Sequence, residues 1–471
     1  MECLSSRAQR KFAFYPAIIS ENCILSYTHL NALVTATVEK LKAFHITPRT
    51  HVAIYSPNTV EYIILLLALW RQRAITCLLN IYLPPRSIQR QMQSVRCPIV
   101  FCNLENKQKI ARKGFKILVI EDFIPFVVGK TIKSTTAFSV SLNQTITIMF
   151  TSGSSGEPKA AVHTLANHYY SALGSNQNIP IKTLDRWLLS LPLYHVSGLS
   201  ILFRCILGGG AVVIPKVKAK IDTMIESFRV THTSLIAIQL QRLLKTKNVK
   251  KSLKSLKAIL LGGGPIPRPL ITECLKKYLP LYTTYGLTEM SSQVATSQKL
   301  KTNDQRPKAK ILRYRKLKIS KAGEVLVKGQ TLFKGYLKGK RIIRPSDNDG
   351  WFHTGDLGKL ERGKYLTVFG RKDNLFISGG ENIQPEEIER YLLAIKGIEK
   401  AVVVPCKDEK FDWRPVAFIK RRYKQTPHSK KIINLLEKHL PRFKIPIKFY
   451  RWPSHIQSKH KINRKLFEKL L

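Results

Sequence analysis

The sequence predicts an α/β protein that contains more than one domain. Strand-like and helical patterns alternate near the start of the chain, and this alternation favours parallel strands with helices on both faces of the sheet. The 471 residues exceed what a single hydrophobic core usually covers. Because 44% of the residues are hydrophobic and 9% are aromatic, the chain can bury a large core and does not belong to the disordered class.

The first elements alternate as an α/β fold requires. Apolar residues at helical spacing predict a helix over residues 26–44, which Ser26 can cap. Residues 51–55 then read as a strand, residues 61–70 as a buried helix and residues 74–79 as a second strand. This strand–helix–strand unit implies parallel pairing of its two strands.

Cysteine usage and hydropathy indicate a soluble, cytoplasmic protein. The eight cysteines are scattered and form no C-x-x-C pair, which argues against a disulfide framework and a zinc site. The longest strongly apolar run, Tyr62 to Trp70, is too short to span a bilayer. Residues 1–12 lack the apolar segment of a signal peptide.

The charge balance is unusual. The chain has 79 Lys and Arg residues against 30 Asp and Glu residues, a formal net charge of +49. Such an excess is typical of proteins that bind nucleic acid or anionic membranes, but here it is spread over the whole length, with clusters at 299–318 and 420–424. We favour a general lysine bias over nucleic-acid binding, which stays as an alternative of a different class. Attraction of polyanionic substrates is compatible with both.

A Ser/Gly-rich loop follows the apolar run 146–150. It reads T-S-G-S-S-G-E-P-K and ends at Lys159. Glycines let the backbone approach a ligand closely, so that N–H groups and hydroxyls can surround phosphate oxygens while the lysine adds positive charge. The spacing is not that of a Walker A loop. An ordinary surface loop between a strand and a helix is the alternative.

Three further motifs follow in order: Tyr285-Gly-Leu-Thr-Glu289, T-G-D ending at Asp356, and G-R-K-D ending at Asp373. Together with the Ser/Gly loop they resemble the adenylate-forming superfamily of acyl-CoA synthetases, adenylation domains and luciferases. The segments L-P-L-Y-H-V-S-G and S-G-G-E-N-I-Q-P-E-E-I-E are especially similar to the o-succinylbenzoate–CoA ligases. The resemblance implies a large AMP-binding domain with mostly parallel sheets (residues 1–370) and a small, mobile α+β domain (residues 371–471).

The resemblance also implies a reaction in two steps. A carboxylate attacks the α-phosphorus of ATP to give acyl-AMP and pyrophosphate, and the thiol of CoA then displaces AMP after the small domain has swung about Asp373. Lys461 is the expected adenylation lysine, although Lys459 competes because His460 stands where the family has glycine. Glu289 would hold Mg²⁺.

The residues expected to bind ATP or AMP are Thr151, Ser152, Gly153, Ser154, Ser155, Gly156, Lys159, Gly263, Gly264, Tyr285, Gly286, Thr288, Asp356 and Arg371. In particular, the tyrosine would stack on adenine, and the aspartate would accept hydrogen bonds from both ribose hydroxyls. Gly379 and Gly380 would line the channel for the pantetheine thiol.

The acid substrate is expected near His195. The alternative for this residue is a buried histidine of the core with no functional role. Ser197 and Arg204 are seven residues apart, about two helical turns, so they would face the same side of a helix. Arg204 could pair with a second carboxylate of the substrate, and a surface arginine is the alternative.

Other readings stay open. Another aryl- or fatty-acyl-CoA ligase would share most of these motifs, and a stand-alone adenylation domain is less favoured because no carrier-like G-x-D-S-L segment adjoins the chain. The oligomeric state is open, with a homodimer as one alternative. Residues 297–318 depart from the family pattern and are expected to form a short, basic loop.

Overall fold

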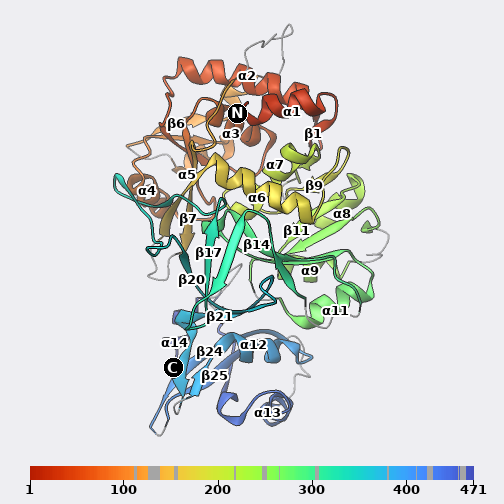
Figure 1. Cartoon of the computed structure of the whole chain (residues 1–471), viewed down its shortest axis with the longest axis vertical. Helices are drawn as coiled ribbons and strands as arrows, with labels where there is room; N and C mark the ends of the chain where they lie inside the picture. The colour runs from red at the N-terminus through yellow and green to blue at the C-terminus, as the bar shows by residue number, and fades with distance from the viewer. Residues whose placement is uncertain are drawn as a thin grey trace.

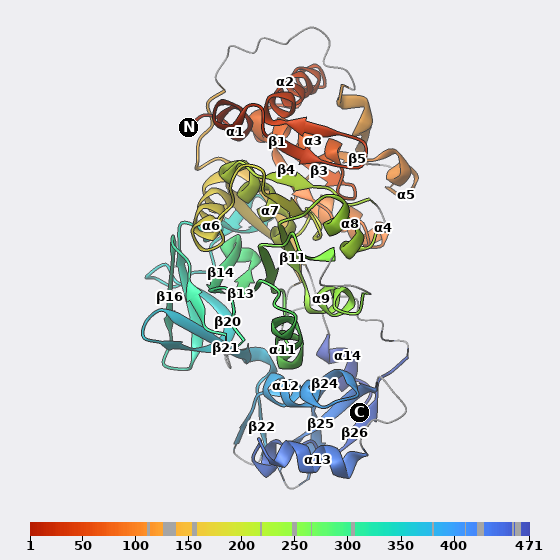
Figure 2. The same ribbon diagram turned by 90° about the vertical axis from the view of Figure 1, so that its right-hand side faces the viewer.

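The computed structural model describes residues 1–110, 114–125, 138–152, 158–216, 219–246, 252–264, 266–302, 307–378, 381–409, 411–421, 428–454, 456 and 463–471. In Figures 1 and 2 the molecule is elongated, with the last elements of the chain gathered at its lower end and the N-terminus towards the opposite end.

Two large mixed sheets build the N-terminal part. Within the described residues the first has eight strands, in the order β19 (Arg341–Ile343), β18 (Gly335–Lys338), β8 (Pro158–Thr164), β7 (Thr145–Ser152), β4 (Ile75–Leu78), β3 (His51–Tyr55), β5 (Ile99–Cys102) and β6 (Lys116–Val119). The strands from β7 to β6 are parallel, whereas β8, β18 and β19 extend the sheet antiparallel.

The second sheet has thirteen described strands, in the order β16 (Arg315–Ile319), β17 (Glu324–Gly329), β20 (Phe352–Glu361), β21 (Tyr365–Arg371), β15 (Ala309–Ile311), β14 (Ser292–Ser297), β13 (Leu281–Leu287), β12 (Ala258–Leu261), β11 (His232–Leu235), β9 (Arg186–Leu188), β10 (Ala211–Val213), β1 (Pro16–Ile19) and β2 (Ile24–Ser26). The strands from β13 to β1 are parallel, and antiparallel strands continue the sheet on both sides. The predicted α/β class is therefore confirmed.

The described helices of this part are α1 (Leu4–Phe12), α2 (Tyr27–Ala43), α3 (Val60–Arg71), α4 (Pro85–Ser94), α5 (Lys107–Ile110), α6 (Leu165–Asn178), α7 (Val196–Gly208), α8 (Ile221–Ser227), α9 (Ala237–Leu243) and α11 (Arg268–Lys276). The helix predicted over 26–44 is confirmed as α2, and the Ser26 side chain caps it by accepting a hydrogen bond from the His29 N–H at 3.2 Å. Among the helices of the described residues, none combines the length and apolar character that crossing a bilayer requires.

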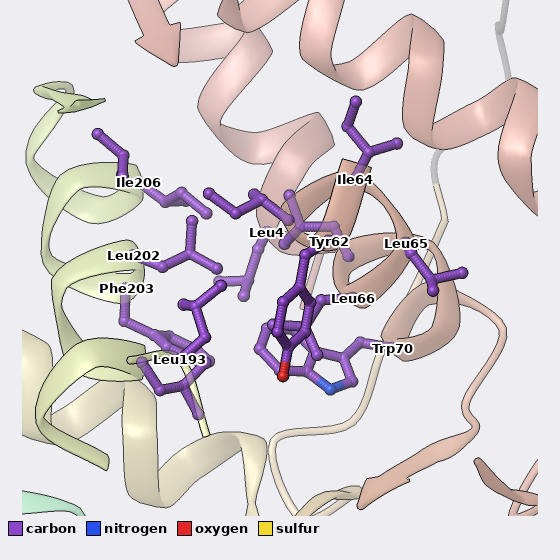
Figure 3. Close-up of a cluster of buried hydrophobic side chains, with 14 of the residues drawn as sticks. Leu4, Tyr62, Ile64, Leu65, Leu66, Trp70, Leu193, Leu202, Phe203 and Ile206 are labelled. Atoms are coloured by element: carbon purple, nitrogen blue, oxygen red, sulfur yellow. The ribbon is translucent and has the colours of Figure 1, made fainter. Parts of the chain in front are cut away.

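Part of the largest hydrophobic cluster of the described residues lies between α3 and α7 (Figure 3). Helix α3 is apolar on all sides between Tyr62 and Trp70 and is capped by Thr59, which accepts from the Tyr62 N–H at 3.1 Å. Trp70 packs against Phe203 of α7, with ring centroids 5.3 Å apart. The Trp70 indole also donates to the Ile146 carbonyl at 3.1 Å, so this core holds the strand that leads into the Ser/Gly loop.

The C-terminal part has a three-stranded sheet and a small hairpin. Its elements are β22 (Phe376–Ser378), β23 (Glu381–Ile383), α12 (Pro385–Ala394), β24 (Ile398–Asp408), β25 (Asp412–Arg421), α13 (Ser429–Glu437), β26 (Phe449–Arg451) and α14 (Arg464–Glu468). The residue expected to be the hinge, Asp373, lies in the 3-10 helix η4 (Lys372–Asn374) directly after β21. The domain boundary at residue 370 stays a prediction.

The expectation of a basic loop over residues 297–318 was wrong for much of this segment. The chain forms β15 and most of β16 there. In β16 the side chains of Arg315 and Leu317 are buried while Lys316 between them is exposed. Lysines therefore occupy the more exposed positions of a strand. Their number hid the alternation of buried and exposed residues in the sequence.

Candidate active site

The β7–β8 hairpin fixes both ends of the Ser/Gly loop. Thr151 lies opposite Lys159 in the antiparallel register. The Lys159 ammonium lies 5.3 Å from the centroid of the Tyr336 ring, a cation–π distance. The predicted phosphate-binding residues Gly153, Ser154, Ser155 and Gly156 lie outside the described residues, and so does the side chain of Ser152.

Glu289 is held beside Lys159 through Tyr336. It lies in the 3-10 helix η3 (Thr288–Met290), directly after β13. The Tyr336 hydroxyl donates to Glu289 Oε1 at 2.6 Å, and the N–H of Phe333 donates to the Glu289 carbonyl at 2.8 Å. Burial, and secondarily the Glu289 charge, raises the pKa of Tyr336, so the phenol keeps its proton. Sequence reasoning did not assign Tyr336 to the site.

A buried histidine supports the same turn. His163 Nε2 lies 2.8 Å from the Thr288 carbonyl oxygen, which can only accept, so this nitrogen carries the proton. Burial lowers the pKa of His163 to about 4. The centroid of the neighbouring His168 ring is 5.0 Å away. Burial, and secondarily repulsion from His163 when that ring is protonated, lowers the pKa of His168 well below the usual value. Both rings are therefore neutral at pH 7.

Asp356 is the centre of a second cluster. Tyr285 donates its hydroxyl to Asp356 Oδ2 at 2.6 Å, and Arg371 Nη1 donates to Asp356 Oδ1 at 3.2 Å. A carboxylate offers about four lone-pair positions, so about two remain for a ligand. Gly355 has a φ of +71°, and a Cβ atom there would lie 2.6 Å from Arg371 Nη2. Only glycine fits this turn without displacing the arginine.

At two of the predicted glycine positions, close packing or the backbone conformation favours glycine over other residues. A Cβ atom on Gly286 would lie 2.2 Å from the Ser292 carbonyl oxygen, so a side chain there would disrupt the β13–β14 pairing. Gly263 has a φ of +85° after β12, and Gly264 follows it with an exposed backbone. Contact of these glycines with a nucleotide stays a prediction.

Arg204 is the most unusual side chain of the region. It is only 1% exposed, so the alternative of a surface arginine is wrong. Its Nη2 donates to Gln293 Oε1 at 3.0 Å, and its guanidinium lies 5.1 Å from the Trp187 ring. Its Nε and Nη1 are buried with no hydrogen-bond partner among the described residues. Burial lowers the pKa of Arg204 to about 10, so it remains a cation at neutral pH.

Gln293 connects this arginine to the nucleotide motif. In the β13–β14 ladder Gln293 lies directly opposite Gly286. Helix α7 carries both Ser197, half-buried in its first turn, and Arg204. His195 directly precedes α7 with an exposed side chain, and its ring centroid is 4.6 Å from that of Tyr194. The alternative of a core histidine is therefore wrong.

The predicted CoA-channel residues, Gly379 and Gly380, and both lysine candidates, Lys459 and Lys461, lie outside the described residues. The nearest described part of the tail is firmly anchored. Arg464 donates to the Glu389 Oε2 at 2.8 Å and to the Val403 carbonyl at 2.7 Å.

The hinge region is bridged by two contacts. Arg371 Nη2 donates to Asp373 Oδ2 at 3.1 Å, and Gln384 Nε2 donates to the Arg371 carbonyl at 3.1 Å. A Cβ atom on Gly370 would lie 2.4 Å from Gln384 Nε2, so the small domain packs directly on bare backbone here. The hinge role of Asp373 stays a prediction.

Glu289 offers a carboxylate to a cation that arrives with a nucleotide. Within the described residues, no group of three or more His, Cys, Asp and Glu side chains could hold a metal. Mg²⁺ commonly binds through one or two carboxylates, water and substrate phosphates. Glu289 can supply one such carboxylate.

The family model of the AMP-binding enzyme matches residues 5–337. The chain belongs to this family. The resemblance drawn from the motifs is thereby confirmed. Among curated relatives, a 2-succinylbenzoate–CoA ligase of Bacillus cereus is 33% identical over 444 residues, which cover 92% of this chain and 90% of that protein.

Solved structures of family members give the same picture. The o-succinylbenzoate CoA synthetase from Bacillus subtilis in complex with ATP and magnesium ion is 28% identical with a TM-score of 0.87, over 99% of each chain. The same enzyme in complex with the acyl-adenylate intermediate OSB-AMP is 27% identical with a TM-score of 0.86, over 99% of this chain and 98% of that chain. The adenylate-forming fold is confirmed.

Proposed function

We propose that this protein is an AMP-forming acid–CoA ligase that converts 2-succinylbenzoate into 2-succinylbenzoyl-CoA through an acyl-adenylate, with release of AMP and pyrophosphate. The observation that carries the choice of acid is Arg204. A buried guanidinium with two unpartnered nitrogens calls for an anionic ligand, since burying an uncompensated charge is costly. Carboxylates are natural bidentate partners of arginine.

The position of Arg204 suits the second carboxylate of such an acid. Its partner Gln293 lies across the ladder from Gly286 of the nucleotide motif. An acid bound between Gly286 and Arg204 would present one carboxylate to the nucleotide and the other to Arg204. The relatives reported above are named for 2-succinylbenzoate, and one of them binds its acyl-adenylate.

The nucleotide would bind across the two clusters. Asp356, with its two remaining lone-pair positions, would accept the ribose hydroxyls, while Lys159 would face phosphate. Glu289 would hold the magnesium ion, which when bound reduces the repulsion between the acid and the triphosphate. Neutral His163 keeps the Thr288–Glu289 turn in place through its backbone carbonyl.

The two steps would need two positions of the small domain. Lys461 would stabilise charge during adenylation, and Gly379 and Gly380 would then admit the CoA thiol after rotation about Asp373. The Gln384 bond to the Arg371 carbonyl crosses this hinge, so it would have to break during the rotation. We place the reaction in the cytoplasm; the oligomeric state stays open.

The experiment is a substrate screen with purified protein. Pyrophosphate release is measured with Mg-ATP and a panel of 2-succinylbenzoate, benzoates and fatty acids, and thioester formation is measured after CoA is added. We expect the highest kcat/KM with 2-succinylbenzoate. Higher kcat/KM with a benzoate or a fatty acid would favour the alternative ligase, and no ATP consumption with any acid would refute an acid–CoA ligase.

A further inference from the structure

Arg204 is not the only buried cation in this region. Arg315 of β16 is 6% exposed. Within the described part of the chain, neither guanidinium has a carboxylate partner: Arg204 donates to Gln293, and Arg315 donates to carbonyl and hydroxyl oxygens. Two buried like charges without a counter-ion are unfavourable, so their retention requires an explanation.

Gln293 joins the two arginines. Its side-chain oxygen accepts from Arg204 Nη2 at 3.0 Å, and its backbone carbonyl accepts from Arg315 Nε at 2.7 Å. The charge of Arg204 adds to burial in lowering the pKa of Arg315 to about 9. Both groups are therefore close enough to interact and are still protonated at neutral pH.

The two guanidinium groups differ in what they can still bind. Every nitrogen of Arg315 already donates: Nη1 to the Arg313 carbonyl at 2.8 Å, and Nη2 to the carbonyl and hydroxyl of Ser171 at 3.1 and 2.9 Å. A Cβ atom on Gly174 of α6 would lie 2.4 Å from Arg315 Nη1, so the helix leaves room for this side chain. Arg315 is thus a fixed charge, whereas Arg204 retains two nitrogens for a ligand.

We propose that Arg315 is a specificity-determining residue, which with Arg204 forms a pair of buried positive charges that selects acids carrying a second carboxylate. Arg204 would contact that carboxylate, and Arg315 would act through its electric field without touching it. An acid without that second carboxylate would leave both buried charges uncompensated. This inference rests on the proposed function, because it assumes that the acid binds beside Arg204.

The test compares binding of acids that differ by one carboxylate. Isothermal titration measures the affinity of 2-succinylbenzoate, of 3-benzoylpropionate and of 2-butyrylbenzoate, each of the last two lacking one carboxylate. For Arg315→Gln we expect the affinity to fall by about tenfold or more for 2-succinylbenzoate and for the monocarboxylate that keeps the Arg204-facing carboxylate, as loss of a nearby buried charge predicts. The affinity for the other monocarboxylate, which lacks that group, should change by less than about twofold. Arg315→Lys should retain most of the preference.

Arg313→Gln is the matched control, because Arg313 is exposed and packs over Tyr314 at 5.2 Å. It should leave all three affinities unchanged. A merely structural role of Arg315 would weaken all acids equally in Arg315→Gln, and that result would overturn the inference.

A second variant supplies the missing counter-ion from within the protein. Gln293→Glu would place a carboxylate against Arg204, while Thr296, which now accepts from Gln293 Nε2 at 2.9 Å, could donate instead. We expect a higher unfolding temperature and loss of the preference for 2-succinylbenzoate. An unchanged preference, or wild-type protein that binds all acids equally or binds none, would overturn the inference. Turnover of 2-succinylbenzoate by the same wild-type protein would leave the proposed function standing.

Discussion

Replacement of Asp356 by asparagine tests whether this carboxylate binds the ribose. Its two oxygens accept from Tyr285 and Arg371, at 2.6 and 3.2 Å. In Asp356→Asn the remaining oxygen must face the Arg371 guanidinium, because an amide N–H cannot. The amide nitrogen then faces Tyr285, and the negative charge that would receive a ribose hydroxyl is lost.

The magnitude follows from one hydrogen bond to a charged acceptor. Such a bond contributes about 1.5–3 kcal/mol, so the Kd for AMP should rise by about 10- to 150-fold. Isothermal titration with AMP gives this ratio directly. Titration with 2′-deoxy-AMP and 3′-deoxy-AMP separates the ribose contribution, since the wild-type protein should lose affinity for each analogue and Asp356→Asn should lose much less.

Asp373→Asn provides the matched control. Asp373 also pairs with Arg371, at 3.1 Å, but its side chain is 58% exposed, so its ion pair is screened by solvent. It should change the Kd for AMP by less than about threefold. If folded Asp356→Asn binds AMP within twofold of wild type, or discriminates as strongly against the deoxy analogues, the ribose assignment is refuted.

Three further predictions concern ionisable side chains. His163 has a pKa of about 4 in the folded protein, against 6.5 in the unfolded chain, so the unfolded state binds more protons between these pH values. The free energy of unfolding should therefore fall by up to about 1.4 kcal/mol per pH unit as the pH drops from 6.5 to 4. Urea denaturation of wild type and His163→Gln should show a shallower pH dependence in the variant. Arg464→Ala should lower the free energy of unfolding by about 3–5 kcal/mol because it leaves the Glu389 carboxylate buried and unpaired; a loss below about 1 kcal/mol in the same assay would contradict this. Lys461→Ala should abolish acyl-adenylate formation yet leave thioester formation from supplied acyl-adenylate, with Lys459→Ala as control; equal loss of both half-reactions, measured by pyrophosphate release and by CoA consumption, would refute the division of labour.

The sequence by itself determined the family, the order of the motifs and the elements with strong local signals. Helix α3 was predictable because its apolar residues form one uninterrupted run, and α2 because Ser26 supplies a local cap. Basic residues in β15 and β16 masked the strand signal, since strand pairing depends on partners that lie far away in the chain.

Only the tertiary structure decided the contacts that define the site. Tyr285 and Asp356 are 71 residues apart, and Arg204 and Gln293 are 89 apart. Helical spacing placed Arg204 on α7 but left open whether its side chain meets water, a carboxylate or the Gln293 amide. Periodicity specifies the face of an element on which a residue lies. What that face meets depends on sheet order and register, which come from packing of the whole chain.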